Sequence, residues 1–266
     1  MKEDERRPLV LVSNDDGYGA PGIEAMVLAL ETWATVVVVA PAVDQSACSH
    51  KLSFRRPLPW REEARMRFSV HGTPADCVYL GILGGERVAP RVPDLVVSGL
   101  NLGCNLGVDV YYSGTVAAAR EAAMRGVPGV AFSADPHTDM RRAASLCSDL
   151  AKCMLDVLQP RRPVVLNVNV PAHGSWEVCR TRLGRRRYGE RVQYCREELG
   201  GEFLLLGDAK VVSNDLTPGT DTHAIDVGMV SVTGLPLTPS DEKDTERAVE
   251  AVVEAMRLGC GKVSER

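Results

Sequence analysis

The chain has 266 residues, a length that accommodates one large domain or two small ones. Forty-five per cent of its residues are hydrophobic and 25% are charged, as in an ordinary globular protein, and its net charge is −4. This mild charge argues against bulk electrostatic capture of nucleic acid, which requires a strongly basic surface, so we expect no sequence-specific nucleic-acid partner. The net charge does not argue against a local site for a small anion, because such a site can be positive on an acidic protein.

The sequence carries no pattern typical of export or membrane insertion. Residues 2–7 are all charged, and its longest apolar runs have the length of a strand. The eight cysteines form no Cys-x-x-Cys pair, which favours reduced thiols over zinc or redox chemistry. We therefore expect a cytoplasmic protein without a membrane partner.

Strands and helices alternate over about residues 8–171. Short apolar runs predict buried strands at 9–13, 35–40, 95–98, 127–132 and 164–170. Apolar residues at helical spacing, or alanine-rich composition, predict helices at 23–30, 115–125 and 143–157. This order predicts a mostly parallel sheet with helices on both faces, which is an α/β three-layer sandwich.

The pattern changes after Pro171. Residues 176–212 contain β-prone stretches, among them 191–194 and 203–206, and residues 228–232 resemble one more strand. Thr238-Pro239-Ser240-Asp241 is typical of a helix start and predicts a C-terminal helix over about 239–258. We expect a single domain, 1–266, with a β-rich extension over about 172–235.

Polar residues follow three of the predicted strands where each one ends. Asp15 and Asp16 follow the first, Ser46 follows the second, and Asn101 follows the third. Loops at the carboxyl ends of parallel strands converge, and oxygen ligands of these types suit hard cations such as Mg²⁺, Mn²⁺ or Ca²⁺. Two adjacent aspartates also repel each other unless a cation lies between them. The alternative is that Asp15 caps the next helix while Asp16 is solvated.

The same first loop contains a second pattern. Residues 17–22, Gly-Tyr-Gly-Ala-Pro-Gly, fit the G-x-G-x-x-G fingerprint of dinucleotide-binding proteins and lie between a strand and a helix. Asn14, Asp15 and Asp16 intervene before the first glycine, however, and two carboxylates beside a pyrophosphate would repel it. An NAD-binding oxidoreductase therefore stays as an alternative function, as does a nucleotide-binding module without catalysis.

A candidate phosphate site lies at the start of the alanine-rich helix. Ser113, Gly114 and Thr115 precede or open that helix, and free N–H groups at a helix N-terminus attract anions. The alternative is a plain serine cap. Asn105 lies shortly before this segment, so a metal and a helix N-terminus are expected to hold a phosphate monoester between them.

Taken together, these motifs resemble the SurE family of survival proteins, which act as 5′/3′-nucleotidases. The resemblance rests on residues 14–22, 98–109 and 112–119, and continues more sparsely through 72–79, 167–171 and 220–222. It implies a Rossmann-like core, a divalent metal (one per subunit, Mg²⁺ or Mn²⁺, or Ca²⁺ in crystals) and hydrolysis of nucleoside monophosphates to nucleoside and phosphate. It also implies a homodimer or homotetramer assembled through the β-rich extension.

The resemblance also implies the site residues. The metal ligands are Asp15, Asp16, Ser46 and Asn101, and the two aspartates are the catalytic residues. We add phosphate or substrate contacts at Asn14, Gly17, Asn105, Ser113, Gly114 and Thr115.

The sequence departs from the family pattern in places. Ala47 follows Ser46 where the family usually has glycine, and Leu102 replaces a small residue beside Asn101. Met229 and Gly234 replace a common aromatic residue and a common proline. An arginine-rich stretch over 180–191 has two interpretations: a solvated face or subunit contact, or a lip that attracts anionic polymers such as short polyphosphate.

Overall fold

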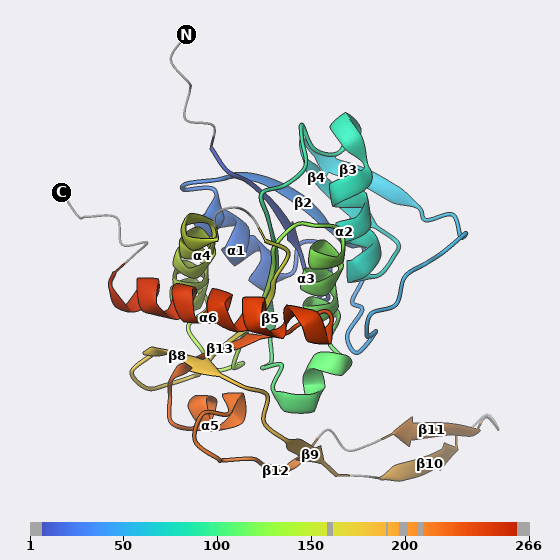
Figure 1. Cartoon of the computed structure of the whole chain (residues 1–266). Coiled ribbons are helices and arrows are strands. Elements are labelled where there is room, and N and C mark those ends of the chain that lie inside the picture. Colours follow the sequence, from blue (N-terminus) through green and yellow to red (C-terminus); the bar gives the residue numbers. More distant parts are fainter. Residues whose placement is uncertain (1–6, 159–161, 190, 197–201, 207–209, 260–266) are drawn as a thin grey trace.

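The computed structural model describes residues 7–158, 162–189, 191–196, 202–206 and 210–259. In this part of the chain a nine-stranded sheet runs in the order β3-β4-β2-β1-β5-β6-β7-β13-β8, between two layers of helices (Figure 1). The charged start of the chain, up to residue 6, and Cys260 lie outside the described residues. None of the described helices is both long enough and apolar enough to cross a membrane.

The main sheet contains β1 (Leu9–Ser13), β2 (Thr35–Pro41), β3 (Trp60–Ala64), β4 (Arg67–Val70), β5 (Leu95–Leu102), β6 (Gly129–Ala134), β7 (Val165–Val170), β8 (Val178–Thr181) and β13 (Val230–Gly234). Two strand pairs lie outside it: β9 (Arg186–Tyr188) with β12 (Val211–Asn214), and β10 (Val192–Arg196) with β11 (Glu202–Leu206). The helices are α1 (Pro21–Leu30), α2 (Pro74–Leu83), α3 (Gly114–Met124), α4 (Met140–Val157), α5 (Asp221–Asp226) and α6 (Glu242–Arg257), with short 3-10 turns η1 (Gly85–Arg87), η2 (Gly107–Tyr111) and η3 (Pro239–Asp241).

The central strand β1 explains why the sheet is covered on both faces. All five of its residues are buried, and alternate residues belong to different cores. Val10 and Val12 pack in the cluster that includes residues of α1, α4 and α6, whereas Leu9 and Leu11 pack with residues of α2 and α3. A strand that is buried on both faces reads as a continuous apolar run. The predicted α/β three-layer sandwich is confirmed.

The sheet topology brings the predicted loops together. Strand β1 pairs in parallel with β2 on one side and with β5 on the other, so the chain order reverses at β1. The carboxyl ends of β2, β1 and β5 are therefore neighbours, although β3, β4 and α2 separate them along the chain. A reversal of this kind is where open α/β sheets bind ligands.

Among the elements that were not predicted from the sequence are β3, β4, α2 and the short helix α5. Strands β3 and β4 form an antiparallel pair at the sheet edge, and most of β3 is exposed, so it carries no continuous apolar signal. Helix α2 starts with a capping box between Thr73 and Asp76, with Pro74 at its first position. That start signal is readable in the sequence, because a threonine followed three residues later by an acid is typical of a helix N-terminus.

The region after residue 171 is divided between the main sheet and two separate strand pairs. Strand β13 pairs antiparallel with β7, and β8 pairs in parallel with β13, so both extend the main sheet. The β10–β11 pair extends away from the body of the molecule (Figure 1). Helix α6, preceded by η3, packs on β8, β13 and α4, close to where the C-terminal helix was predicted.

Candidate active site

A pocket of about 360 Å³ lies at the carboxyl ends of β2, β1 and β5. Asp15 and Asp16 follow β1, Ser46 lies in the loop after β2, and Asn101 lies within the last residues of β5. All four predicted metal ligands line this pocket. Its volume is within the usual range for small-molecule sites, roughly 300–1,000 Å³.

Asp15 is buried and is held by the first residues of α3. The Thr115 hydroxyl donates to Oδ1 of Asp15 at 2.5 Å, and the Thr115 backbone N–H donates to Oδ2 at 3.1 Å. Burial raises the pKa of Asp15, and these two hydrogen bonds act in the opposite direction. The helix approaches this closely because residue 114 is glycine: a Cβ there would lie 2.9 Å from Cβ of Asp15 and 3.0 Å from Sγ of Cys48.

Asp16 is less buried, and it lies in a field of negative charge. Burial is the first cause that raises its pKa, to about 6, and the charges of Asp15 and Asp44 add to it. A carboxylate that is partly desolvated beside other carboxylates is costly to keep ionised. A bound divalent cation would offset this repulsion directly.

Ser46 is positioned by Asp44. The Oδ1 atom of Asp44 accepts the Ser46 backbone N–H at 2.8 Å and the Ser46 hydroxyl at 2.6 Å. Ala47, next along the chain, adopts the left-handed backbone conformation with φ of 57°. Glycine adopts this conformation without steric cost, so the glycine expected at this position from the resemblance would suit the turn, and in this chain alanine adopts it.

Asn101 is directed by an irregularity in β5. The sequence placed residues 99–101 in a loop, but β5 continues to Leu102, and its pairing with β6 shifts between Ser98 and Asn101. Gly99 has φ of 127°, and a Cβ there would lie 2.3 Å from the carbonyl oxygen of Phe132. The amide nitrogen of Asn101 donates to the Gly103 carbonyl at 2.6 Å, so its amide oxygen is the atom that it can offer to a cation.

These four side chains fit a hard divalent cation. Among the described residues, no cluster of three or more His, Cys, Asp or Glu side chains is arranged to hold a metal. The set at this pocket is of another kind, because it combines two carboxylates with a hydroxyl and an amide oxygen. All-oxygen ligands of this type suit Mg²⁺, Mn²⁺ and Ca²⁺.

The predicted phosphate contacts fall into two groups. Ser113 and Asn105 line the pocket, whereas Asn14, Gly17, Gly114 and Thr115 do not. Ser113 caps α3, because its hydroxyl oxygen accepts the Val116 N–H at 3.1 Å. Thr115 is fully buried and turns its hydroxyl toward Asp15, not toward the pocket. Asn14 is also fully buried, and its amide nitrogen closes the turn by donating to the Gly17 carbonyl.

Buried polar residues that the sequence analysis gave no role hold the loop between β5 and α3. The main chain of Asn105 accepts hydrogen bonds from the side chains of Asn167 and Asn169, and its N–H donates to Asn169. Asp221 accepts the backbone N–H groups of Gly107 and Gly184, both within 2.8 Å. The signal available in the sequence was the asparagine pair within the apolar run 164–170.

The glycines of the G-x-G-x-x-G pattern serve packing. A Cβ on Gly22 would lie 1.9 Å from the carbonyl oxygen of Leu100, so glycine allows α1 to lie directly against β5. Gly17 and Gly19 both have positive φ, in the turn that carries the chain from β1 to α1. This geometry gives the alternative of a dinucleotide site no support. The glycine pattern instead allows β5 to lie beside the pocket.

A buried ion-pair network anchors the loop that carries Ser46. Nε2 of His50 lies 2.9 Å from Oε2 of Glu121, and Nε of Arg125 lies 2.7 Å from Oε1 of the same carboxylate. The Glu121 side chain is only 2% exposed. Burial acts to raise the pKa of Glu121, but the hydrogen bonds from His50 and Arg125 outweigh it, so the pKa is lowered.

Replacing Glu121 with glutamine is expected to lower the free energy of unfolding by about 1–3 kcal/mol at neutral pH, because two donors lose a buried carboxylate. A lowered folded-state pKa gives stability that is complete above the unfolded value of 4.5 and is lost as pH falls through the folded value. Urea unfolding at several pH values should thus show wild type and E121Q converging below pH 4.5. An unchanged difference there would contradict the assignment, and E86Q, at an exposed site, is the control.

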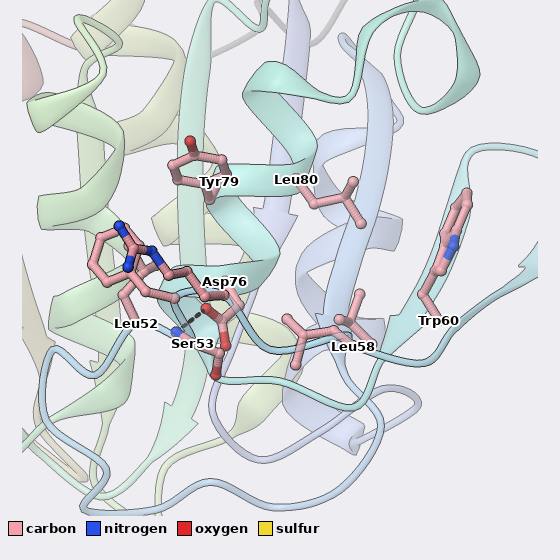
Figure 2. Close-up of a pocket in the computed structure, with 10 residues that line it drawn as sticks. Leu52, Ser53, Leu58, Trp60, Asp76, Tyr79 and Leu80 are labelled. Carbon is pink, nitrogen blue, oxygen red and sulfur yellow. Dashed lines mark hydrogen bonds between the residues drawn. The ribbon is translucent and has the colours of Figure 1, made fainter.

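A second pocket, of about 370 Å³, lies between α2 and the loop before β3 (Figure 2). Its walls are largely apolar, with Leu58, Trp60 and Leu80 among them. Asp76 is the acidic residue in its lining, and both of its carboxylate oxygens already accept backbone N–H groups, from Ser53 and Thr73. The Asp76 carboxylate therefore serves the backbone around it, and the pocket lining contains no second acidic side chain to complete a metal site.

The arginines of the stretch over 180–191 differ in their surroundings: some form ion pairs and others are exposed to solvent. Arg180 forms ion pairs with Glu246 and Glu250 of α6. Arg186 forms a 2.8 Å ion pair with Asp109, a residue that lines the first pocket. Arg185, Arg187 and Arg191 are exposed.

Comparisons with known proteins agree with this geometry. The family model described as "Survival protein SurE" matches residues 10–190. A "5'-nucleotidase SurE" from Sorangium cellulosum is 54% identical over 234 residues, which are 87% of this chain and 90% of that protein. One of the same name from Syntrophotalea carbinolica is 45% identical over 86% of this chain and 91% of its own length. The crystal structure of the Sure protein from Aquifex aeolicus has 37% identity and a TM-score of 0.72, and the match covers 91% of this chain and all of that one.

Proposed function

Because the chain belongs to the SurE family, we propose that its first pocket hydrolyses nucleoside 5′-monophosphates, and 3′-monophosphates as well, to nucleoside and phosphate in a metal-dependent reaction. The observation that carries this proposal is the meeting of Asp15, Asp16, Ser46 and Asn101 in one pocket beside the start of α3. The protein is then a 5′-nucleotidase, a phosphatase-type hydrolase, like the relatives that carry that name. The oxidoreductase alternative has no support among these relatives.

The four oxygen-bearing side chains would hold one divalent cation, Mg²⁺ or Mn²⁺, with Ca²⁺ as a possible substitute in crystals. When bound, the cation supplies positive charge that polarises the phosphoryl group. Both carboxylate oxygens of Asp15 accept hydrogen bonds from Thr115, which orients the side chain for this role. Asp16 stands at the less buried side of the same pocket. Both aspartates contact the reacting groups in this scheme and are its catalytic residues.

The start of α3 would bind the phosphate. The Ser113 oxygen already accepts a hydrogen bond from Val116, so its own hydrogen is free to be donated to a phosphate oxygen. The dipole of α3 favours negative charge at this end. Asn105 also lines the pocket, and its amide nitrogen donates a hydrogen bond to the Ser133 hydroxyl. In the reaction, water forms a bond to phosphorus, the bond to the nucleoside oxygen breaks, and that oxygen takes up a proton.

A substrate panel tests the proposal. We expect phosphate release from nucleoside 5′- and 3′-monophosphates and from para-nitrophenyl phosphate, with at most weak release from nucleoside triphosphates. NAD(H) fluorescence should show no titratable binding, because Gly22 packs against β5 and Gly17 lies against Val43. Tight nucleotide binding without phosphate release from any of these compounds would leave only the non-catalytic binding module.

We further propose that the protein is a homodimer or homotetramer, and that the β10–β11 pair lies in the subunit contact. Val192, Tyr194 and Leu204 on this pair are exposed, and Tyr194 is the most exposed of them, at 82%. An isolated two-stranded pair is only marginally stable in water, so a partner surface would stabilise it.

Replacing Tyr194 with glutamate is expected to lower the mass measured by light scattering to that of the monomer, because a charge would be buried in the contact. Leu28→Glu is the matched control, since Leu28 is an exposed apolar residue on α1, distant from the pair. An oligomer that persists in Y194E would exclude this surface.

Two further proposals concern the cellular location of the protein and a secondary anionic ligand. The seven described cysteines are all free thiols, which supports a cytoplasmic location. The exposed Arg185, Arg187 and Arg191 would attract a short polyphosphate by charge.

A further inference from the structure

Tyr188 is an aromatic residue that the β-rich extension contributes to the first pocket. It is the last residue of β9, it lines the pocket together with Asp15 and Asn101, and its side chain remains 37% exposed. The residues with the metal-binding and phosphate-binding chemistry come instead from the ends of β1, β2 and β5 and the start of α3. Tyr188 therefore lines a part of the pocket to which we assign neither metal binding nor phosphate binding.

The position of the Tyr188 ring is fixed from several sides. Its hydroxyl donates to Oδ2 of Asp109 at 2.8 Å, and the same carboxylate oxygen accepts Nη1 of Arg186 at 2.8 Å. The guanidinium carbon of Arg186 lies 5.9 Å from the centre of the ring. The backbone of Tyr188 pairs with Val211 of β12. Burial of the hydroxyl is the main reason that the pKa of Tyr188 is raised, so the phenol stays protonated and keeps donating.

Asp109 also connects this ring to the phosphate end of the pocket. Its backbone carbonyl accepts the N–H groups of Tyr112 and Ser113, at 2.9 and 3.0 Å, and Ser113 caps α3. One residue thus positions both the tyrosine ring, through its side chain, and the proposed phosphate donor, through its main chain. Both ends of the pocket are thus tied to the same residue of η2.

A nucleoside monophosphate has an aromatic base at the end opposite its phosphate. Every base presents a π-face, and a preorganised aromatic side chain offers a stacking surface that tolerates all of them. Most of the remaining lining is polar, which suits the phosphate and the sugar, and its second aromatic residue, Tyr112, adjoins the proposed phosphate donor Ser113. We propose that Tyr188 is a specificity-determining residue whose ring stacks against the base of the bound nucleotide, and that Arg186 and Asp109 are positioning residues for that ring.

This inference rests on the proposed function and has its own test. Steady-state kinetics are compared for a nucleoside 5′-monophosphate and for ribose 5-phosphate, which keeps the phosphate and the sugar but has no base. For Y188A we expect KM for the nucleotide to rise about tenfold or more, with kcat little changed. The constants for ribose 5-phosphate should stay as in wild type. Y188F retains the ring and should retain most of the preference, and Y111A, at an exposed tyrosine outside the pocket lining, is the matched control.

Each other outcome has a definite meaning. Equal losses on both substrates in Y188A would overturn the inference, because they would show a structural role for the tyrosine. A wild-type enzyme with no preference for the nucleotide over ribose 5-phosphate would overturn it as well, while leaving the phosphatase function intact. Absence of phosphate release from both compounds in wild type would instead refute the proposed function.

Discussion

Asp15→Asn is expected to reduce phosphate release from a nucleoside monophosphate by at least about 10²–10³-fold, the loss typical when one preorganised charged group is removed from a reaction centre. The substitution keeps the size of the side chain and one oxygen that can accept from Thr115. It removes the charge that would bind the cation. Thermal unfolding should therefore stay close to wild type, or improve, because a buried carboxylate with a raised pKa is relieved.

Asp139→Asn is the matched control for this variant. Asp139 is an exposed N-cap of α4 outside the pocket, and asparagine caps helices as well as aspartate does. D139N should keep both wild-type activity and wild-type stability. Wild-type turnover by D15N would show that Asp15 has no catalytic role.

Gly22→Ala is expected to destabilise the protein strongly. Its Cβ would lie 1.9 Å from the Leu100 carbonyl oxygen, which is backbone and cannot rotate away. The loss in free energy of unfolding should be about 2–4 kcal/mol, because α1 or β5 must shift. Asn101 follows Leu100 directly, so metal-dependent activity in the surviving folded protein should fall too.

Gly19→Ala separates packing from backbone strain. A Cβ on Gly19 meets nothing within 4 Å, although its φ of 78° makes alanine strained, at about 1–2 kcal/mol. Urea unfolding should therefore rank G22A as clearly less stable than G19A. The reverse order would show that the glycine pattern is needed for its turn, and not for the approach of α1 to β5.

The parts of the fold that could be predicted are the elements with a strong local sequence signal. The apolar runs of β1, β2 and β7 give strong signals because both faces of these strands are buried. The edge strand β3 gives none, since nearly all of it faces solvent. The extension was read as one β-rich unit, but β8 and β13 continue the main sheet, because β13 pairs with β7 across a long sequence separation.

The site was predictable in its composition, and less so in its detail. The meeting of the loops at the carboxyl ends of the strands was expected from a general rule for open α/β sheets, whereas the order of the strands came from the structure. The direction of a side chain does not follow from such a rule. Thr115 turns toward Asp15 because α3 starts against that carboxylate, and Tyr188 reaches the pocket from a strand that no local pattern linked to it.

The central claim is that an all-oxygen site at the end of β1 hydrolyses phosphate monoesters with a divalent cation. The most direct measurement is phosphate release from a nucleoside 5′-monophosphate by protein treated with EDTA, before and after Mg²⁺ or Mn²⁺ is added. We predict no release in EDTA, restored release in wild type after metal addition, and release by D15N that stays at least about 10²-fold below that of wild type after metal addition. Release that is insensitive to EDTA, or equal in wild type and D15N, would contradict the account.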